Sequence, residues 1–181
     1  MDIPICGVTE LMVVEYAKWP GKFPTIPWHV DLAGYRGNLS QDQLREVFRL
    51  AWAAWADVLD FTAVQVETAA DAFVQKHFKT IDGPSGVLAW SELADNTNRP
   101  KTQRYDTGDR WSADSGPNPP GIDLIRVATH EIGHVLGLDH DNGNAQAIMR
   151  PMYSTNLPRP TQRDFQRMVG LGYKLRIDNY V

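Results

Sequence analysis

The sequence predicts one globular domain of the α+β class, with an α/β-like succession of strands and helices. Its 181 residues, 43% hydrophobic and 22% charged, suffice for one core without disulfides, and a second full domain does not fit. Capping residues and apolar spacing mark the helices, and short β-rich segments lie between them. The predicted order is strand, helix, several strands, long loop, helix, loop and helix.

The first strand and helix have the clearest patterns. Thr25–Asp31 is a strand candidate, and Ser40 to Gln43 is a capping box that opens a helix reaching about Leu59. An apolar stripe with three-and-four spacing predicts that one face of this helix is buried in the core rather than used for binding. The stripe consists of Leu44, Val47, Phe48, Ala51, Ala54, Trp55 and Val58.

The middle of the chain predicts short strands and a loop. Phe61–Val66, Asp71–Val74 and Val87–Trp90 are strand candidates, the last after a Gly-Pro-Ser-Gly turn. Asn96–Pro120 is rich in Asn, Asp, Gly, Pro and Ser, which favours a functional or mobile segment over regular structure. Thr161 opens a final capped helix.

The segment from His130 to His140 reads His-Glu-Ile-Gly-His-Val-Leu-Gly-Leu-Asp-His and predicts a metal site with a base beside it. Residues four apart share a helix face, so His130 and His134 can bind one cation. Gly137 suits the left-handed residue that ends such a helix, after which the chain can bring His140 back as a third ligand. Three imidazoles leave one position of Zn²⁺ open for water, and Glu131 is placed to deprotonate it.

An ordinary core histidine is the alternative for any one of these positions. The five specified residues would coincide by chance with a probability on the order of one in 100,000. Three of the chain's five histidines stand at these offsets. The spacing therefore favours a metal site.

Composition narrows the expected partners. A net charge of −4 and a pI near 5.7 argue against nucleic acid, and no basic run suggests a membrane surface. No apolar stretch is long enough to span a bilayer, and the opening residues lack a signal-peptide core. A single cysteine excludes an internal disulfide and leaves the compartment open.

The histidine segment and the turn after it resemble the metzincin zinc endopeptidases, and among these the matrix metalloproteinases, or matrixins. Ala147–Tyr153, which reads Ala-Ile-Met-Arg-Pro-Met-Tyr, is similar to the matrixin Met-turn, with Met149 beneath the metal. Three upstream segments resemble matrixin segments in the same order: Lys18–Trp19, Asp82–Ala89 and Asp106–Trp111. The resemblance covers nearly the whole chain, and the histidine motif with its turn is the most specific part.

This resemblance implies the zincin fold: a twisted, mostly parallel five-stranded sheet with one antiparallel edge strand, two long helices and a small C-terminal subdomain with one helix. It divides the chain into residues 1–16, a propeptide remnant, and residues 17–181, a catalytic domain. The upper subdomain then reaches residue 137, and the lower one begins at residue 138. A secreted location is also implied, although this chain shows no signal peptide.

The implied activity is hydrolysis of internal peptide bonds in extended substrates by a metal-activated water and a glutamate base. Leu88 and Ala89 match the edge strand that binds substrate by β-augmentation. Pro151 and Tyr153 match the outer wall of the S1′ pocket, and Arg126 matches its base. An inward Arg126 would make the pocket shallow or gated, whereas a solvent-facing one would leave it open.

The resemblance also bears on two structural metal sites. Asp82, Asp106 and Asp109 match positions that bind Ca²⁺ in matrixins, and a solvated turn is the alternative. The family's second, structural zinc site aligns with Gln75, His77, Trp90 and Arg104. Only the histidine among these could ligate, so we expect one zinc, with Trp90 and Arg104 packed in that volume.

Pro4–Val8, which reads Pro-Ile-Cys-Gly-Val, resembles the cysteine switch of matrixin propeptides, in which a thiolate takes the fourth zinc position. Cys6 would be that ligand. Ile5 replaces the family's arginine, which removes a charge-paired anchor and predicts weak latency. A lone reduced cysteine near a frayed terminus is the alternative. Asp141 stands where matrixins more often carry Ser or Thr, and it resembles the adamalysin branch of the metzincins. Adamalysin-type domains contain disulfides, however, which a single cysteine cannot form.

Two other functions stay open. A catalytically silent zinc-binding interaction module is the main alternative, and Glu131 argues against it because zinc ligation does not require that carboxylate. A self-latent zymogen fragment predicts that Cys6→Ala raises activity in the untrimmed chain.

Overall fold

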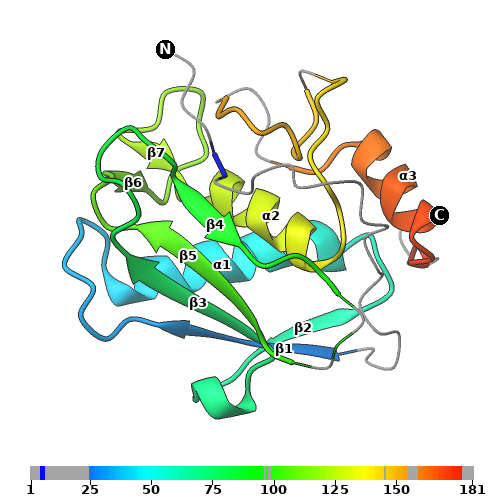
Figure 1. The fold of residues 1–181 in the computed structure, drawn as a ribbon, viewed down its shortest axis with the longest axis horizontal. Helices are drawn as coiled ribbons and strands as arrows, with labels where there is room; N and C mark the ends of the chain where they lie inside the picture. The colour runs from blue at the N-terminus through cyan, green and yellow to red at the C-terminus, as the bar shows by residue number, and fades with distance from the viewer. Residues whose placement is uncertain are drawn as a thin grey trace.

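A five-stranded sheet with two helices packed across it forms the fold in the computed structural model (Figure 1). The structure describes residues 5–6, 25–95, 97, 99–144, 146–154 and 159–176. Lys18–Trp19, and residues 4, 7 and 8 of the N-terminal motif, lie outside these ranges. The elements are β1 (Thr25–Asp31), α1 (Gln41–Ala56), β2 (Thr62–Gln65), the 3₁₀ turn η1 (Ala69–Asp71), β3 (Val74–Lys79), β4 (Ala89–Ser91), β5 (Lys101–Asp106), β6 (Trp111–Ser112), β7 (Ile122–Asp123), α2 (Leu124–Val135) and α3 (Gln162–Gly170).

The sheet has the strand order β2-β1-β3-β5-β4. Its first four strands are parallel, and β4 is an edge strand that runs antiparallel to β5. The predicted mostly parallel sheet with one antiparallel edge strand is therefore confirmed. The pair β6 and β7 forms a separate two-stranded ribbon just before α2.

Local sequence signals account for α1. Ser40 accepts a hydrogen bond from the Gln43 backbone at 3.2 Å, and the Gln43 side chain accepts one from the Ser40 backbone at 2.9 Å. Five of the seven residues of the apolar stripe are buried as predicted, Ala54 and Val58 are half-buried, and Trp52 is an additional buried member. The helix ends at Ala56 rather than near Leu59, because Leu59 instead forms a bridge with the C-terminal segment.

Two predictions in the middle of the chain are wrong. The segment Asp71–Val74 is not a strand: residues 69–71 form a 3₁₀ turn, and β3 begins only at Val74. Asn96–Pro120 is not irregular throughout, because β5 lies inside it and pairs with β3 on one side and β4 on the other. Pairing with distant strands overrides a composition that by itself favours a loop.

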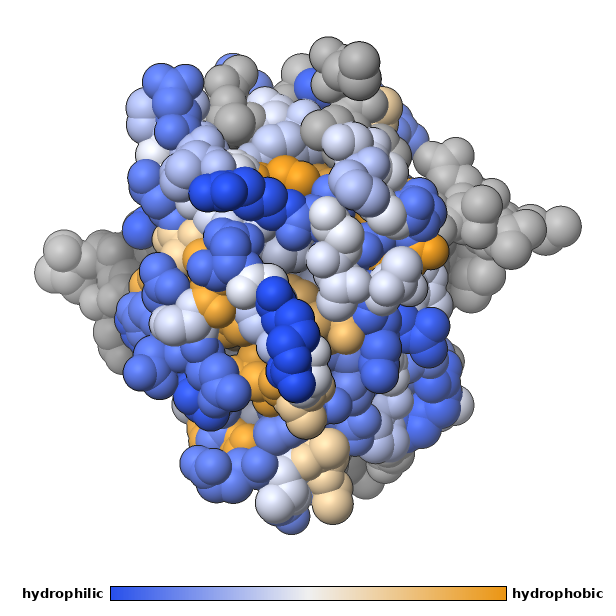
Figure 2. Space-filling view, turned by 90° about the vertical axis from the view of Figure 1, so that its left-hand side faces the viewer, coloured by the Kyte–Doolittle hydropathy of each residue, from blue (hydrophilic) through white to orange (hydrophobic). Residues whose placement is uncertain are grey.

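One cluster of buried apolar side chains joins the sheet, α1 and α2, and it includes Ile5 and Cys6 from the N-terminal segment. The face of the molecule in Figure 2 is mainly hydrophilic, with hydrophobic residues visible in narrow strips between polar ones. Among the described residues, no helix is long and apolar enough to cross a membrane.

Candidate metal centre

The helix α2 carries the first two histidines and ends where the motif requires it to end. Asp123 caps its N-terminus by accepting a hydrogen bond from the Arg126 backbone at 3.0 Å. At the other end Gly137 has φ 107°, in the left-handed region that suits glycine. The Leu138 amide donates to the Gly133 carbonyl at 2.8 Å and the Gly137 amide to His134 at 3.0 Å, which is a Schellman motif. This turn reverses the chain toward His140.

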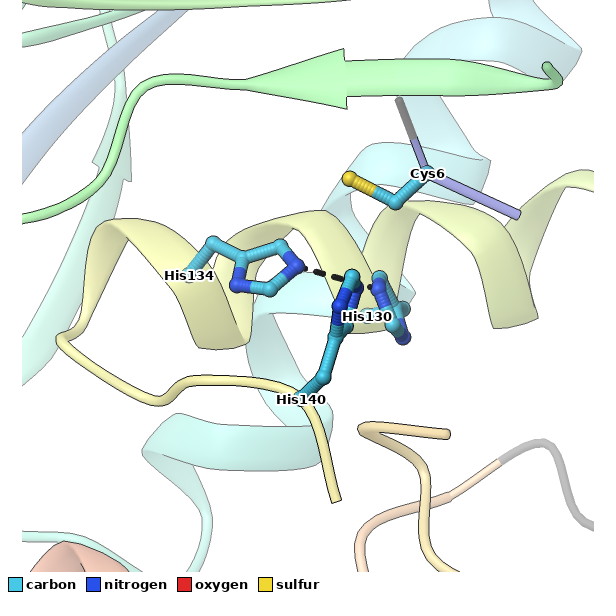
Figure 3. A group of neighbouring side chains, drawn as sticks. All are labelled: Cys6, His130, His134 and His140. Atoms are coloured by element: carbon cyan, nitrogen blue, oxygen red, sulfur yellow. Dashed lines mark hydrogen bonds between the residues drawn. The ribbon is translucent and has the colours of Figure 1, made fainter. Parts of the chain in front are cut away.

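The three histidines of the motif converge, with Cys6 next to them on the β4 side (Figure 3). One ligand atom from each of Cys6, His130, His134 and His140 lies within 4.8 Å of the other three. The imidazole centroids are 4.8 to 5.3 Å apart. Three nitrogens and one sulfur at such separations form a donor set that suits Zn²⁺.

The hydrogen bonds of two rings fix which nitrogen faces the centre. His130 Nδ1 lies 2.8 Å from the Ile148 carbonyl oxygen, and His134 Nδ1 lies 2.8 Å from that of Leu138. A carbonyl can only accept, so each Nδ1 carries the proton and each Nε2 offers a lone pair. These Nε2 atoms are 3.1 Å apart, marked by the dashed line in Figure 3. Two facing lone pairs repel unless a cation lies between them, and tetrahedral zinc would set them about 3.3 Å apart. The residues therefore fit a zinc ion.

Burial keeps these rings in the neutral form that metal binding needs. It lowers the pKa of His130 well below the usual value, and His134 and His140 lower it further. Burial, with His140 as the next cause, lowers the pKa of His134 to about 3. Neutral imidazole is the form that ligates metals.

The Glu131 side chain lies beside the histidines without belonging to their cluster. The Cys6 thiol donates to its Oε2 at 3.7 Å, while Oε1 is buried and has no hydrogen-bond partner among the described residues. Burial raises the pKa of Glu131 to about 8, against smaller opposing effects of Cys6 and Lys76. A bound cation would favour the ionised carboxylate. The position suits a base rather than a ligand.

The loop that carries His140 is held by α3, which sequence reasoning did not anticipate. Arg163 Nε lies 2.6 Å from Asp141 Oδ2, and Arg167 donates to the Asp139 carbonyl at 2.8 Å. Side chains that orient ligands in this way contribute to metal affinity. The only sequence signal was the unusual Asp141, because the arginines follow it by more than 20 residues.

Met149 lies fully buried against α2 at Gly133. A Cβ at Gly133 would approach the Met149 sulfur more closely than van der Waals contact allows, and would come within 3.2 Å of Trp55. The glycine between His130 and His134 is therefore needed for packing. The Asp141 amide donates to the Met149 carbonyl at 2.9 Å, so the methionine also braces the His140 loop.

The described part of the N-terminal segment lies between β4 and the segment after Met149. The Ile5 amide donates to the Pro151 carbonyl at 2.8 Å, and the Ala89 amide donates to the Ile5 carbonyl at 2.8 Å. Cys6 pairs with Ala89 as a parallel bridge, and the Ile5 side chain is completely buried. This segment thus occupies the edge of β4 beside the metal centre.

The residues matched to the S1′ pocket lie around the start of α2. The Asp123 amide donates to the Tyr153 hydroxyl at 2.9 Å, which ties the segment after Met149 to this helix. Arg126 is 1% exposed, so its side chain points inward, and its Nε and Nη1 have no partner among the described residues. Burial lowers its pKa, opposed first by Asp123. Leu88 is fully buried, and its carbonyl accepts from β5 at 2.9 Å.

The three predicted calcium residues surround one turn but use their oxygens differently. Asp106 Oδ2 accepts from the backbone amides of residues 81, 82 and 83, and Oδ1 accepts from that of residue 108. Asp82 accepts from Val87, and Asp109 Oδ1 from Ser85. Asp109 Oδ2 is buried without a partner among the described residues, and burial, with the charges of Asp106 and Asp82, raises the pKa of Asp109. The carboxylates do not form a cluster of converging ligand atoms in the described ranges.

The four positions aligned with the family's structural zinc lie on neighbouring strands. Arg104 pairs with Trp90 across β4 and β5, and its guanidinium lies 5.4 Å from the Trp90 ring centre, so these two side chains pack together as predicted. His77 Nδ1 lies 3.4 Å from Asp31 Oδ2, and the Gln75 side-chain amide donates to the Ala69 carbonyl in η1 at 2.8 Å.

Comparison with known proteins gives the family. The family described as Matrixin matches residues 18–170. Human matrix metalloproteinase-26 is 32% identical over 176 residues, which cover 91% of this chain and 65% of the relative. Mouse stromelysin-3 is 34% identical over 137 residues, covering 72% and 27%, and rat stromelysin-1 is 32% identical over 170 residues, covering 88% and 34%.

The chain spans between about a quarter and two thirds of the length of these curated relatives. The first of them is named a matrix metalloproteinase, in line with the histidine and cysteine ligand set described above. With a family match across most of its length, this chain belongs to the matrixins.

Proposed function

We propose that this chain is a zinc-dependent endopeptidase that hydrolyses internal peptide bonds of extended proteins or peptides. The observation that carries the proposal is the convergence of three neutral imidazoles beside a buried glutamate that is not itself part of the ligand cluster. A silent zinc-binding module would not need that glutamate. Family membership supports the class of activity.

Each residue of the cleft would have a separate role in binding substrate or in catalysis. The outer edge of β4, near Ala89, would pair with the backbone of a substrate strand. Pro151 and Tyr153 would line the pocket for the side chain after the scissile bond, and the inward Arg126 would make that pocket shallow. Glu131 would take a proton from the attacking water and pass it to the leaving nitrogen. A bound zinc supplies a Lewis acid that polarises the scissile carbonyl and acidifies water.

Cys6 would keep the untrimmed chain latent. Its sulfur belongs to the same ligand cluster as the three histidines, and the backbone of Ile5 takes up hydrogen-bonding groups of Ala89 and Pro151 that a substrate would use. On this proposal residues 1–16 are a propeptide remnant, and residues 17–181 are the catalytic domain with subdomains divided at residue 137. We further propose that the protein is a secreted monomer, in line with its membership of the matrixins.

A structural Ca²⁺ at the turn after β3 is a secondary proposal. It rests on the negative charge of Asp82, Asp106 and Asp109 and on the buried Oδ2 of Asp109. Asp106 already accepts four backbone hydrogen bonds, so Asp109 and backbone carbonyls are the better ligand candidates. Elemental analysis should give one zinc and one calcium per chain. Two zinc ions would contradict the single zinc site, and absence of calcium would contradict the calcium site.

The activity is tested with casein and the zinc-loaded full chain. Cys6→Ala should raise cleavage, a zinc chelator should abolish it, and Glu131→Gln should abolish it while leaving the zinc content unchanged. Chelator-insensitive cleavage, or a Glu131→Gln variant as active as its parent, would refute the proposed mechanism. Equal activity of the wild-type and Cys6→Ala chains would refute latency alone.

A further inference from the structure

A hydrogen-bond chain of buried polar side chains connects the middle of the sheet to the backbone of α2. It begins at Lys76 on β3, whose Nζ donates to Gln103 Oε1 on β5. Gln103 Nε2 donates to Ser91 Oγ on β4 at 3.2 Å. The Ser91 hydroxyl in turn lies 3.2 Å from the Glu131 carbonyl oxygen and 3.1 Å from that of Glu92. Lys76, Gln103 and Ser91 are at most 1% exposed.

Lys76 occupies a place that an apolar residue could fill. Its Nζ lies 5.2 Å from the ring centres of Phe48 and Trp52, and none of the ion pairs among the described residues includes it. Burial lowers the pKa of Lys76 well below its usual value, and the charge of Glu131 opposes this shift. Burying an amino group without an ionic partner is unfavourable. A methionine of similar length would avoid that cost but would lose the hydrogen bond to Gln103 and the cation–π contacts with the two rings.

Lys76 sets the donor-to-acceptor direction of this chain of hydrogen bonds. A lysine amine at this place donates to Gln103 Oε1, which also accepts from the Tyr105 hydroxyl at 3.2 Å. With two donors on its oxygen, the Gln103 amide must turn its NH₂ toward Ser91. The Ser91 oxygen then accepts from Gln103, and its single proton is left for the carbonyls of Glu92 and Glu131.

This chain of hydrogen bonds ends on α2 at the backbone of Glu131, the residue proposed as the base. The Trp55 indole donates to the Thr129 carbonyl at 3.0 Å, and the Ala94 amide to that of His134 at 3.2 Å. The Ser91 bond falls between these two contacts, at the residue whose side chain would act as the base. It ties that turn of α2 to β4, the strand on which substrate would lie.

We propose that Lys76 is a positioning residue for Glu131: through Gln103 and Ser91 it holds the Glu131 turn of α2 at a set distance from β4. This inference rests on the proposed peptidase activity. Lys76 contacts neither the metal ligands nor the substrate cleft, so its contacts reach α2 through the chain of hydrogen bonds, and its charge also acts on Glu131. A small displacement of a catalytic group can lower the rate by up to about 100-fold.

The test compares Lys76→Met with Lys101→Met in the zinc-loaded full chain carrying Cys6→Ala. Lys101 is the matched control, because it is 1% exposed on β5 and pairs with Asp95 at 2.5 Å instead of joining the chain. We expect Lys76→Met to lower kcat about 10-fold or more with KM and zinc content unchanged, and Lys101→Met to leave kcat within about twofold.

A further variant separates positioning from folding. Ser91→Ala removes the last link with little change in volume and should lower kcat as Lys76→Met does, even if the lysine variant folds poorly. Unchanged kcat in Lys76→Met and Ser91→Ala, or equal losses in both lysine variants, would overturn the inference.

Failure of the proposed function itself is recognised separately. It would appear as absence of chelator-sensitive cleavage in the Cys6→Ala parent, or as full activity of Glu131→Gln. The positioning chain is then judged by hydrogen exchange at the Val135 amide, whose helical acceptor is the Glu131 carbonyl. Faster exchange in Lys76→Met than in Lys101→Met supports the chain, and equal exchange overturns it.

Discussion

Truncating Ile5 to alanine tests whether apolar burial, rather than a charged anchor, holds the N-terminal segment in the cleft. The Ile5 side chain is completely buried, and its backbone is bonded on both sides. Burying such a side chain contributes about 1.5 to 3 kcal/mol. Losing about 2 kcal/mol would raise the population of the open cleft about 30-fold, because each 1.4 kcal/mol corresponds to a factor of ten. The truncation keeps Cys6 and both backbone hydrogen bonds.

The assay is cleavage of a quenched fluorescent peptide by the zinc-loaded full chain. Ile5→Ala should raise the initial rate about 30-fold if the parent is mostly closed, and Ile5→Val, which removes one methylene, about fivefold. Leu50→Ala is the control, since it shortens an exposed aliphatic side chain on α1. An apolar anchor also predicts no increase in activity between 0.1 and 1 M NaCl, unlike an exposed ion pair. If Cys6→Ala activates the chain and Ile5→Ala does not, the apolar anchor is ruled out.

Three further predictions concern the supports of the site. Gly133→Ala should lower the free energy of unfolding by about 1 to 3 kcal/mol in urea titrations, because the new methyl group collides with Met149; an unchanged midpoint would contradict this packing. Arg167→Ala should weaken zinc binding about 10- to 100-fold in chelator competition, since it frees the loop of His140; equal affinity would show that α3 does not orient this ligand. Burial raises the pKa of Asp106, but four backbone donors lower it more, so the net shift is downward. The stabilising effect of the ionised Asp106 is therefore complete above the unfolded pKa of about 3.9 and is lost as the pH falls through the lower folded pKa. Asp106→Asn should therefore lose less stability than the parent between pH 5 and pH 3 in thermal melts, and parallel losses would exclude this role.

The predictable features are those that depend on neighbours within a few residues. The Ser40 cap, the apolar stripe of α1 and the strand from Thr25 to Asp31 follow from local hydrogen bonding and periodicity. The same holds for the two histidines on α2 and for the glycine that ends it, because helical geometry alone places them. Resemblance to a family supplied the mostly parallel five-stranded sheet with one antiparallel edge strand, which the strand patterns could not determine.

The features that the sequence did not reveal depend on contacts between distant segments. A polar, glycine-rich stretch contains β5 because strands on both sides satisfy its backbone groups. The inward direction of Arg126 was undecided, since either orientation suits one helix position, and only packing against the segment of Tyr153 resolves it. Lys76 has no motif around it and would ordinarily be assigned to the surface.

By itself the sequence determined the first strand, the capped starts of the helices, the spacing of the ligands and the family resemblance, because each of these depends on residues close together in the chain. The tertiary structure alone decided which side chains support that site: the arginines of α3 behind His140, Met149 against Gly133, and the chain from Lys76 to Glu131. Such contacts join residues far apart in the chain, and their partners become neighbours only when the sheet and helices pack.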